Sequence, residues 1–391
     1  MKNITKSHII LRLKHIHRIS HMEQYDCVVV GAGPGGSVFA RNAARKGLKT
    51  LMIEKESFPR YKACGGGLTL AVKNLLDFDY SFLIERKVGG VAFVSHDEAE
   101  IVSYPDSMPI EMIDRSEFDH YLARQAVSAG AVLIEKTKVV SVTESLDDVV
   151  IETQNGDAIS ALVAVGADGA RSVVARAAGF DRGYGGIAIE TELFPRDPGI
   201  VDEHGGHTVF GFGFIPTDGY GWIFPKKDHF SVGIGTGSAR MPGLASMYRK
   251  FIERFDFLKD ADEEQRRGWF IPYCKSSEII NTRRICLVGD SGHLVDPFSG
   301  EGIYHAILSG IIGADIVSEE LGEKGYLSRQ YSREIKKRIM RDFMFSRWCS
   351  EIYYKAPSYF YRKNRVIQAL TRLARKEIQY KHVLNELRKA R

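Results

Sequence analysis

The stretch "YDCVVVGAGPGGSVFARNAARKG", residues 25–47, decides the fold of this 391-residue chain. It predicts a buried strand, a turn with the spacing Gly-x-Gly-x-x-Gly at Gly31, Gly33 and Gly36, and a helix. The next segment, "KTLMIEK", predicts a second strand that ends at Glu54, where an acid would bind a ribose hydroxyl. Glycines in the turn let the backbone approach a pyrophosphate, and the helix N-terminus attracts the phosphate charge. The complete order therefore predicts a dinucleotide-binding unit.

Two later segments repeat this design and extend the ligand site. Residues 160–179, "SALVAVGADGARSVVARAAG", predict an apolar strand that runs into Asp168. Residues 283–310, "RRICLVGDSGHLVDPFSGEGIYHAILSG", predict a strand that runs into Asp290, followed by a glycine-rich loop and a helix. An acid at the end of a parallel strand, beside a helix N-terminus, suits a second polyol and an electron-rich ring. We therefore expect one long ligand.

In their order along residues 25–321, these motifs resemble the FAD-dependent oxidoreductases of the p-hydroxybenzoate hydroxylase fold, and within them the geranylgeranyl reductase family. The motifs that carry the resemblance are "GAGPGG" with Glu54, "YKACGGGL", "IDRSEFDHYLARQA", "GADGARS", "GYGWIFPKKDHFSVGIG" and "GDSGHLVDPFSGEGI". The resemblance implies an α/β fold with a discontinuous, Rossmann-like FAD-binding domain, an inserted antiparallel β-sheet substrate domain and a helical C-terminal tail.

The positions of the motifs also imply domain boundaries. The FAD-binding domain would take residues 22–185 and 276–325, with a substrate-domain segment at about 71–113; the substrate-binding domain would take residues 186–275, and a basic helical region residues 326–391. Pro357 interrupts this last region, so we expect at least two helices there. Residues 1–21 hold five basic residues, four histidines and no acid, and we expect a disordered or non-native extension before a start at Met22.

The resemblance implies FAD as the cofactor and assigns its contacts residue by residue. The implied FAD-binding residues are Gly31, Gly33, Gly35, Gly36, Glu54, Cys64, Arg115, Val139, Asp290, Gly302 and Ile303. The amides of the last two would lie near the flavin ring. No second nucleotide fingerprint marks a nicotinamide site, so the electron donor is expected to be either NADPH or reduced ferredoxin. No metal site is expected, because the cysteines and histidines lack the spacing of ligands.

The stretch "YKACGGGL", residues 61–68, places one cysteine before three consecutive glycines. In the family this loop lies over the flavin, with Gly66 admitting the substrate. Our hypothesis is that Cys64, or a water that it helps to position, gives a proton during alkene reduction. A thiol is a weak acid suited to proton donation beside an apolar chain, and glycine accepts backbone angles that other residues resist. The alternative is a small buried hydrophobe that fills space near the cofactor.

A second signature, "GYGWIFPK" at residues 219–226, precedes an alternating stretch that predicts a strand. The resemblance places Tyr220, Trp222 and Phe224 on the wall of a substrate cavity, where flat apolar faces suit a polyisoprenoid chain. The alternative is ordinary core packing of aromatic residues on a sheet. Earlier in the chain, "DRSEFDHYLARQA" predicts an amphipathic helix capped by Ser116.

Basic side chains gather in two places. Lys226, Lys227 and His229 are either head-group contacts at the mouth of the substrate cavity or exposed charges on a hairpin. Residues 326–391 hold 18 Lys and Arg against 5 Asp and Glu, a balance of +13, whereas the preceding residues sum to −8. Aromatic residues interleave with these charges, so the region predicts a solvated helical tail or a peripheral contact with acidic lipid. No nucleic-acid partner is expected, since no such module accompanies the charges.

The sequence thus predicts a FAD-dependent oxidoreductase acting on CH–CH groups that is either free in the cytoplasm or peripheral on the cytoplasmic face of a membrane. Five cysteines without a C-x-x-C pair indicate a reduced compartment, and no apolar run is long enough to span a bilayer. The implied reaction hydrogenates the double bonds of a geranylgeranyl chain in a lipid, quinone, chlorophyll precursor or diphosphate. Two alternatives stay open: an aromatic monooxygenase or halogenase of the same fold, and a non-catalytic FAD-binding protein associated with membranes.

Overall fold

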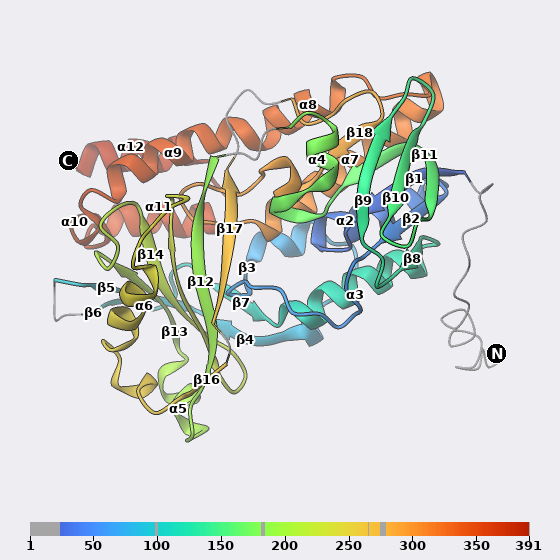
Figure 1. Ribbon diagram of the computed structural model, residues 1–391. Helices are drawn as coiled ribbons and strands as arrows, with labels where there is room; N and C mark the ends of the chain where they lie inside the picture. Colours follow the sequence, from blue (N-terminus) through green and yellow to red (C-terminus); the bar gives the residue numbers. More distant parts are fainter. Residues whose placement is uncertain (1–23, 98–100, 181–183, 265, 274–278, 391) are drawn as a thin grey trace, which may run out of the picture.

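A computed structural model describes residues 24–97, 101–180, 184–264, 266–273 and 279–390 (Figure 1). These residues form a seven-stranded, an eight-stranded and a three-stranded sheet with helices packed around them. The predicted extension at residues 1–21 and start at Met22, and also Cys274, lie outside the described residues. The architecture confirms the predicted α/β fold class.

The seven-stranded sheet unites three separate stretches of chain. It contains β1 (Tyr25–Val30), β2 (Thr50–Ile53), β8 (Val132–Ile134), β9 (Val139–Glu144), β10 (Val149–Thr153), β11 (Ala158–Gly166) and β18 (Ile285–Leu287), packed with helices α2 (Pro34–Arg45), α3 (Arg115–Ser128), α4 (Val173–Ala177) and α7 (Ile303–Lys324). Its order is β8-β2-β1-β11-β10-β9, with β18 paired to β11. The strands β1, β2, β11 and β18 are parallel, so their carboxyl ends share one edge of the sheet. At this edge Glu54 follows β2, Asp168 follows β11 and Asp290 follows β18.

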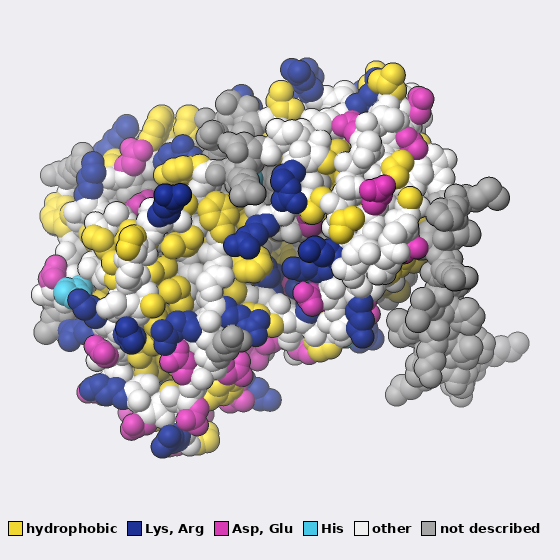
Figure 2. Space-filling view, in the orientation of Figure 1, with side chains coloured by type: hydrophobic (Ala, Val, Ile, Leu, Met, Phe, Trp, Pro, Cys, Tyr) yellow, Lys and Arg dark blue, Asp and Glu magenta, His cyan; other side chains and the backbone are white. Residues whose placement is uncertain are grey.

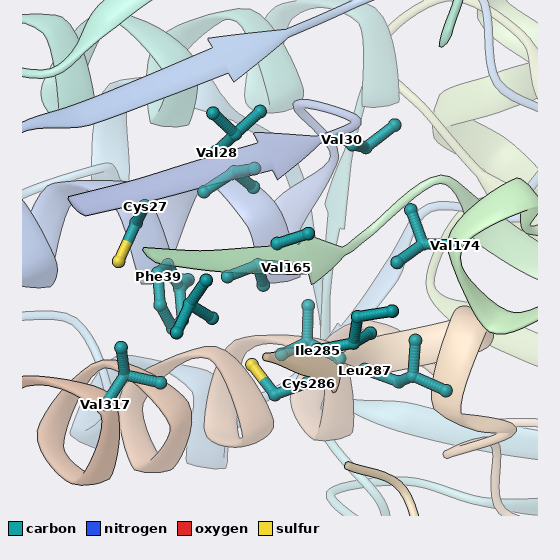
Figure 3. Packing of buried hydrophobic residues seen from close by; sticks show 14 of the residues in the cluster. Cys27, Val28, Val30, Phe39, Val165, Val174, Ile285, Cys286, Leu287 and Val317 are labelled. Atoms are coloured by element: carbon teal, nitrogen blue, oxygen red, sulfur yellow. The ribbon is translucent and has the colours of Figure 1, made fainter. Parts of the chain in front are cut away.

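Helices α2 and α7 cross on this sheet at close range. A methyl group on Gly310 would lie 2.4 Å from the carbonyl oxygen of Gly35, so the crossing tolerates only glycine. In the core between strands and helices, the thiols of Cys27 and Cys286 are fully buried among valine, isoleucine and leucine side chains (Figure 3). Burial raises the pKa of both thiols, and these cysteines therefore act as packing residues.

The eight-stranded sheet forms the other half of the molecule. It contains β5 (Gly90–Ser95), β6 (Ile101–Tyr104), β12 (Tyr184–Phe194), β13 (His207–Phe212), β14 (Gly219–Pro225), β15 (Phe230–Thr236), β16 (Asp262–Glu263) and β17 (Arg267–Tyr273), with helices α5 (Gly199–His204) and α6 (Leu244–Ile252). The strands pair antiparallel, except β5 with β13. A small sheet of β3 (Gly67–Thr69), β7 (Ile110–Ile113) and β4 (Ile84–Val88) lies between the halves (Figure 1). The inserted sheet is as expected, and the residue boundaries of the domains stay a prediction.

The C-terminal region is helical and packs against the eight-stranded sheet. It contains α8 (Gln330–Ile335), a π-helical turn at residues 336–340, α9 (Arg341–Tyr353), α10 (Pro357–Tyr361), α11 (Asn364–Ala374) and α12 (Tyr380–Ala390). Pro357 begins a new helix, as predicted. Of the aromatic residues interleaved with the basic ones, Tyr353, Phe360 and Tyr361 are buried in one cluster with Phe93 and Phe212, which Tyr380 joins, whereas Trp348 and Tyr359 are exposed. The buried rings therefore serve packing, and contact with a membrane stays a prediction. The apolar face of a sheet must be buried against another element, and these aromatic rings bury it.

Two kinds of feature are absent from the part of the chain that the structure describes. No helix there is both long and apolar enough to cross a bilayer. No group of three or more His, Cys, Asp or Glu side chains is arranged to hold a metal ion among the same residues.

Candidate active site

The turn between β1 and α2 forms a cradle free of side chains. Gly31 has a φ of +97°, and a Cβ there would lie 2.4 Å from the carbonyl oxygen of Ala167. A Cβ on Gly36 would lie 2.1 Å from the carbonyl oxygen of Gly31. Gly33 begins α2 without a side-chain cap, and the nearest atom to its Cβ position is a guanidinium nitrogen of Arg60, 3.8 Å away. The first amides of α2 therefore face an open space suited to an anion.

Glu54 lies beside this cradle with its carboxylate buried. Its Oε2 accepts from the backbone nitrogen of Ala32 at 3.0 Å, and its Oε1 accepts from the nitrogen of Glu56 at 3.2 Å. Arg60 Nε lies 3.3 Å from Glu54 Oε2. Val139, the first residue of β9, lies at the same end, because the nitrogen of Thr137 donates to the carbonyl oxygen of Glu54. Glu54, predicted to bind the adenosine ribose, and Val139, predicted to contact the dinucleotide, thus lie at the same end of the sheet.

A buried ion network that the sequence did not reveal continues from Glu54 toward Cys64. Arg60 also binds Asp119 at 3.1 Å, and Arg115 binds the same carboxylate through Nε and Nη2, both at 2.9 Å. Burial lowers the pKa of Arg115, but Asp119 and Cys64 outweigh it, so the pKa is raised overall and the guanidinium stays charged. The spacing of Arg115 and Asp119 on α3, four residues apart, is the one sign of this network in the sequence.

The start of α3 differs in detail from the prediction. Asp114, and not Ser116, is the N-cap: its Oδ1 accepts from the backbone nitrogens of Ser116 and Glu117 at 2.6 and 3.0 Å. A carboxylate satisfies two amides and also complements the helix dipole, which a hydroxyl does less well. This cap fixes the first turn of α3, on which Arg115 stands.

The cysteine–glycine loop, residues 64–67, packs directly on the aromatic signature. The Sγ of Cys64 accepts from the nitrogen of Gly66 at 3.4 Å, and Gly66 has a φ of +66°. A Cβ on Gly65 would lie 2.8 Å from Cδ2 of Phe224 and 3.0 Å from Nε1 of Trp222. Only glycine allows the loop to approach these rings so closely. The loop that carries Cys64 and Gly66 is thus brought next to Trp222 and Phe224 through Gly65.

A second loop closes the site from the other side. Gly302 and Ile303 form the start of α7, and Asp290 Oδ1 lies 3.7 Å from the Cβ position of Gly302. Tyr220 donates from its hydroxyl to the carbonyl oxygen of Ser299 in this loop. A small cavity of about 40 Å³ lies there, lined by Tyr220, Trp222, Tyr273, Phe298, Gly300 and Tyr354 among others. The aromatic signature thus bounds apolar space next to the N-terminus of α7.

The C-terminal region holds this second loop in place, which the sequence also did not reveal. Glu301 accepts from Thr69 Oγ1 at 2.6 Å and from Lys376 Nζ at 2.7 Å. Asp296 accepts from the hydroxyls of Ser346 and Tyr380 at 2.8 and 3.1 Å. These partners are far apart in the chain, so no local pattern announces them.

A polar cavity of about 220 Å³ lies on the other side of the cysteine–glycine loop. Cys64, Arg115, Glu192, Lys226 and His229 are among the residues that line it. Lys226 was predicted either at a cavity mouth or exposed on a hairpin. The exposed position is wrong, because the residue is only 2% exposed, whereas a contact with a head group stays a prediction, since Lys226 lines this cavity. Lys227, the next residue, is exposed.

The comparisons with known proteins agree with this geometry. The sequence profile of the family described as FAD dependent oxidoreductase matches residues 26–192. A digeranylgeranylglycerophospholipid reductase of Thermoplasma acidophilum is 31% identical over 346 residues, which cover 82% of this chain and 85% of the relative. One of Methanothrix thermoacetophila is also 31% identical, over 81% of this chain and 85% of the relative.

Solved structures support the same assignment. A geranylgeranyl bacteriochlorophyll reductase-like protein of Thermoplasma acidophilum has a TM-score of 0.75 and 26% identity, covering 94% of this chain and 96% of that protein. A halogenase, PltM, in complex with FAD has a TM-score of 0.69 at 17% identity, covering 85% of this chain and 77% of its own, and shows the shared fold alone. On the strength of these relatives and of its motifs, the chain belongs to the geranylgeranyl reductase family of FAD-dependent oxidoreductases.

Proposed function

We propose that this enzyme hydrogenates carbon–carbon double bonds of a geranylgeranyl chain, carried by a lipid, quinone, chlorophyll precursor or diphosphate. The observation that carries the proposal is the contact of the cysteine–glycine loop with the aromatic strand, in which a Cβ on Gly65 would lie 2.8 Å from the ring of Phe224. This contact puts a thiol beside an apolar wall. An isoprenoid chain offers almost no hydrogen bonds, so such a wall suits it.

The residues present fit FAD along the whole site. The bare glycine cradle and the uncapped start of α2 suit the pyrophosphate, and the buried carboxylate of Glu54 suits the adenosine ribose. Asp290 and the amides of Gly302 and Ile303, close together at the start of α7, are the groups proposed to hold the electron-rich ring. When bound and reduced, FAD supplies the hydride for the reaction.

The chain itself supplies the proton and the surroundings. Cys64 is the proposed catalytic residue, whose Sγ–H protonates one carbon of the double bond. Gly65 and Gly66 leave room for the substrate above the loop, and Trp222 and Phe224 keep water from the reacting carbons. Arg115, fixed by Asp119, holds a permanent positive charge near the sulfur.

The relatives named digeranylgeranylglycerophospholipid reductase support a lipid-borne chain as the first substrate to test. Such a substrate lies in a membrane, and the proposed enzyme works at a cytoplasmic membrane surface without spanning it. Basic side chains scattered across one face of the molecule are compatible with an anionic surface (Figure 2). NADPH and reduced ferredoxin are the two proposed electron donors.

The test is anaerobic incubation of the FAD-loaded enzyme, reduced with dithionite, with geranylgeranyl diphosphate and with a geranylgeranylated lipid. Mass spectrometry of the prenyl chain should show two added hydrogens for each reduced double bond. Oxygen uptake with NAD(P)H but no change in prenyl mass would favour the monooxygenase alternative. FAD binding without any turnover would favour the non-catalytic one.

The halogenase alternative is disfavoured by one feature of β14. Halogenases of this fold carry the run W-x-W-x-I-P, whereas this strand reads Tyr-Gly-Trp-Ile-Phe-Pro at residues 220–225. The fold likeness to PltM therefore supports no halogenase activity here.

A further inference from the structure

Lys226 is a buried lysine that the proposed reaction leaves without a role. Its side chain reaches across from the end of β14, and its Nζ donates to the carbonyl oxygen of Ile113 at 2.7 Å. The nitrogen of Ile113 in turn donates to the carbonyl oxygen of Gly66 at 2.9 Å. A Cβ on Gly66 would lie 2.3 Å from Lys226 Nζ. The ammonium group therefore touches the cysteine–glycine loop itself.

Two opposing effects act on the pKa of Lys226: burial lowers it, and nearby acidic groups raise it. Burial lowers the pKa of Lys226, and its electrostatic interactions with Glu192, Glu85, Cys64 and Asp114 oppose that effect. A buried lysine with a lowered pKa is a better proton donor near neutral pH than an exposed one. Cys64 is thus one of the groups with which Lys226 interacts electrostatically.

A row of ionisable groups links Lys226 to solvent through the polar cavity. His229 Nε2 lies 3.2 Å from Glu192 Oε2, and His229 Nδ1 lies 2.8 Å from Oδ1 of Asp228, which is exposed. Glu192, His229 and Lys226 line the same cavity of about 220 Å³ as Cys64. A polar cavity of this size holds several water molecules, which can carry a proton between groups that do not touch.

The other ionisable groups that face this cavity, apart from Glu85, have partners of their own. Arg115 is fixed on Asp119. Asp114 caps α3. Tyr61 donates to Glu190 at 2.7 Å. Lys62 stacks on Trp269, its Nζ 3.5 Å from the ring centroid, and burial lowers its pKa to about 8. Glu85 accepts no hydrogen bond at its buried Oε2 among the described residues and is an electrostatic neighbour of Lys226.

We propose that Lys226 is a positioning and proton-returning residue for Cys64, and that Glu192 and His229 connect it to solvent through the polar cavity. The proposal rests on the proposed function. Each reduction breaks the S–H bond of Cys64, and the proton forms a new C–H bond, which leaves a thiolate. An N–H bond of the Lys226 ammonium then breaks as the S–H bond re-forms. The neutral amine regains a proton from water by way of His229 and Glu192, so the protons balance at each turn.

The first test measures the thiol without any reduction reaction. FAD-loaded enzyme is treated with iodoacetamide at several pH values, and alkylation of the Cys64 peptide is followed by mass spectrometry. Loss of one positive charge beside the sulfur in Lys226→Met should slow alkylation about tenfold at pH 7. Lys227→Met removes the neighbouring exposed charge and should leave the rate unchanged. An unchanged rate in Lys226→Met would overturn the proposal.

The second test measures turnover in a different variant, His229→Gln. It can therefore contradict the proposal even if Lys226→Met does not fold. In His229→Gln, the first double bond reduced per enzyme should form at the wild-type rate, since the proton delivered in the first turnover does not pass through His229. Later turnovers should slow at least about tenfold and gain a solvent deuterium isotope effect, with Cys64 alkylation unchanged. Equal slowing of the first and later turnovers would contradict the relay.

The two proposals fail in different ways. If no prenyl substrate is reduced by wild-type enzyme, the proposed function fails, whereas the alkylation comparison still decides whether Lys226 acts on Cys64. If Lys62→Met, and not Lys226→Met, slowed alkylation and the later turnovers, the proton donor would be Lys62 and the proposal for Lys226 would be overturned.

Discussion

Asp119 is the residue at which the charges of the active site converge. Its carboxylate is fully buried and binds both Arg60 and Arg115. Asp77 provides a matched exposed case, because it too binds two arginines, Arg41 and Arg45, but at the surface. A buried ion pair that loses one partner leaves an uncompensated charge, whereas an exposed pair contributes little.

The first prediction compares these two aspartates. Asp119→Asn should lower the free energy of unfolding by about 3–5 kcal/mol and weaken FAD binding, because two buried guanidinium groups lose their anion. Asp77→Asn should leave both quantities nearly unchanged. Denaturant unfolding and flavin fluorescence titration measure the two effects. Equal losses in both variants would show that burial does not decide the importance of the pair.

The second prediction concerns Glu190, which is buried next to Glu192. Burial first, and the charge of Glu192 second, raise the pKa of Glu190 from 4.5 to about 7. The folded state therefore binds this proton more tightly than the unfolded state, so the stabilisation is complete below about pH 4.5 and is lost as pH rises through about 7. Wild type should lose up to about 3 kcal/mol over this window relative to Glu190→Gln.

Unfolding free energies at pH 4.5, 6 and 8 check the prediction for Glu190. Glu203→Gln, at an exposed position, should give a curve parallel to that of wild type. A Glu190→Gln curve that also runs parallel to wild type would show that Glu190 titrates normally in the folded protein.

At the scale of single elements, α7 carries two glycines in opposite environments. A Cβ on Gly310 would lie 2.4 Å from the carbonyl oxygen of Gly35 on α2, whereas the Cβ position of Gly322 has no atom within 4 Å among the described residues beyond its chain neighbours and the adjacent helix backbone. Gly310→Ala should therefore destabilise the fold by about 1–3 kcal/mol through forced separation of the helices. Gly322→Ala should stabilise it by about 0.5–1 kcal/mol, since alanine favours a helix. Thermal unfolding of both variants checks the sign, and the same sign in both would contradict the account.

Elements with a local cause could be predicted from the sequence. The strand, glycine turn, helix and acid of residues 25–54 form as expected, because each depends on neighbours a few residues away. The contact between the cysteine–glycine loop and the aromatic strand was not predicted, because it joins segments about 160 residues apart. The burial of Lys226 could not be predicted, since it depends on a contact with Ile113, more than a hundred residues away. The binding of Arg60 to Asp119 could not be predicted either, since the two residues are about sixty positions apart.

At the scale of the whole molecule, the C-terminal region is coupled to the active site. Lys376, at the end of α11, pairs with Glu301, the residue before the N-cap of α7. Burial raises the pKa of Glu301, but Lys376 and its other neighbours outweigh this effect and lower it overall. A region expected to be a basic tail thus takes part in holding the loop that precedes α7.

The fourth prediction tests this coupling. Lys376→Met should lower the unfolding free energy by about 1–3 kcal/mol, because Glu301 keeps only part of its hydrogen bonds. It should also weaken FAD binding, since the start of α7 is less firmly held. Lys389→Met removes an equally basic but exposed residue of the same region and should change neither quantity. Flavin affinity equal to wild type in Lys376→Met would show that the C-terminal region does not influence the site.

The central claim is that Cys64 and its apolar wall form an alkene-reducing site. The most direct measurement is the mass of a geranylgeranyl lipid after anaerobic incubation with dithionite-reduced, FAD-loaded wild type and with Cys64→Ala. We predict two added hydrogens per double bond with wild type and a rate lower by about 10²–10⁴-fold in Cys64→Ala, which should still bind FAD. Reduction at the wild-type rate by Cys64→Ala, or no mass change with wild type, would contradict the account.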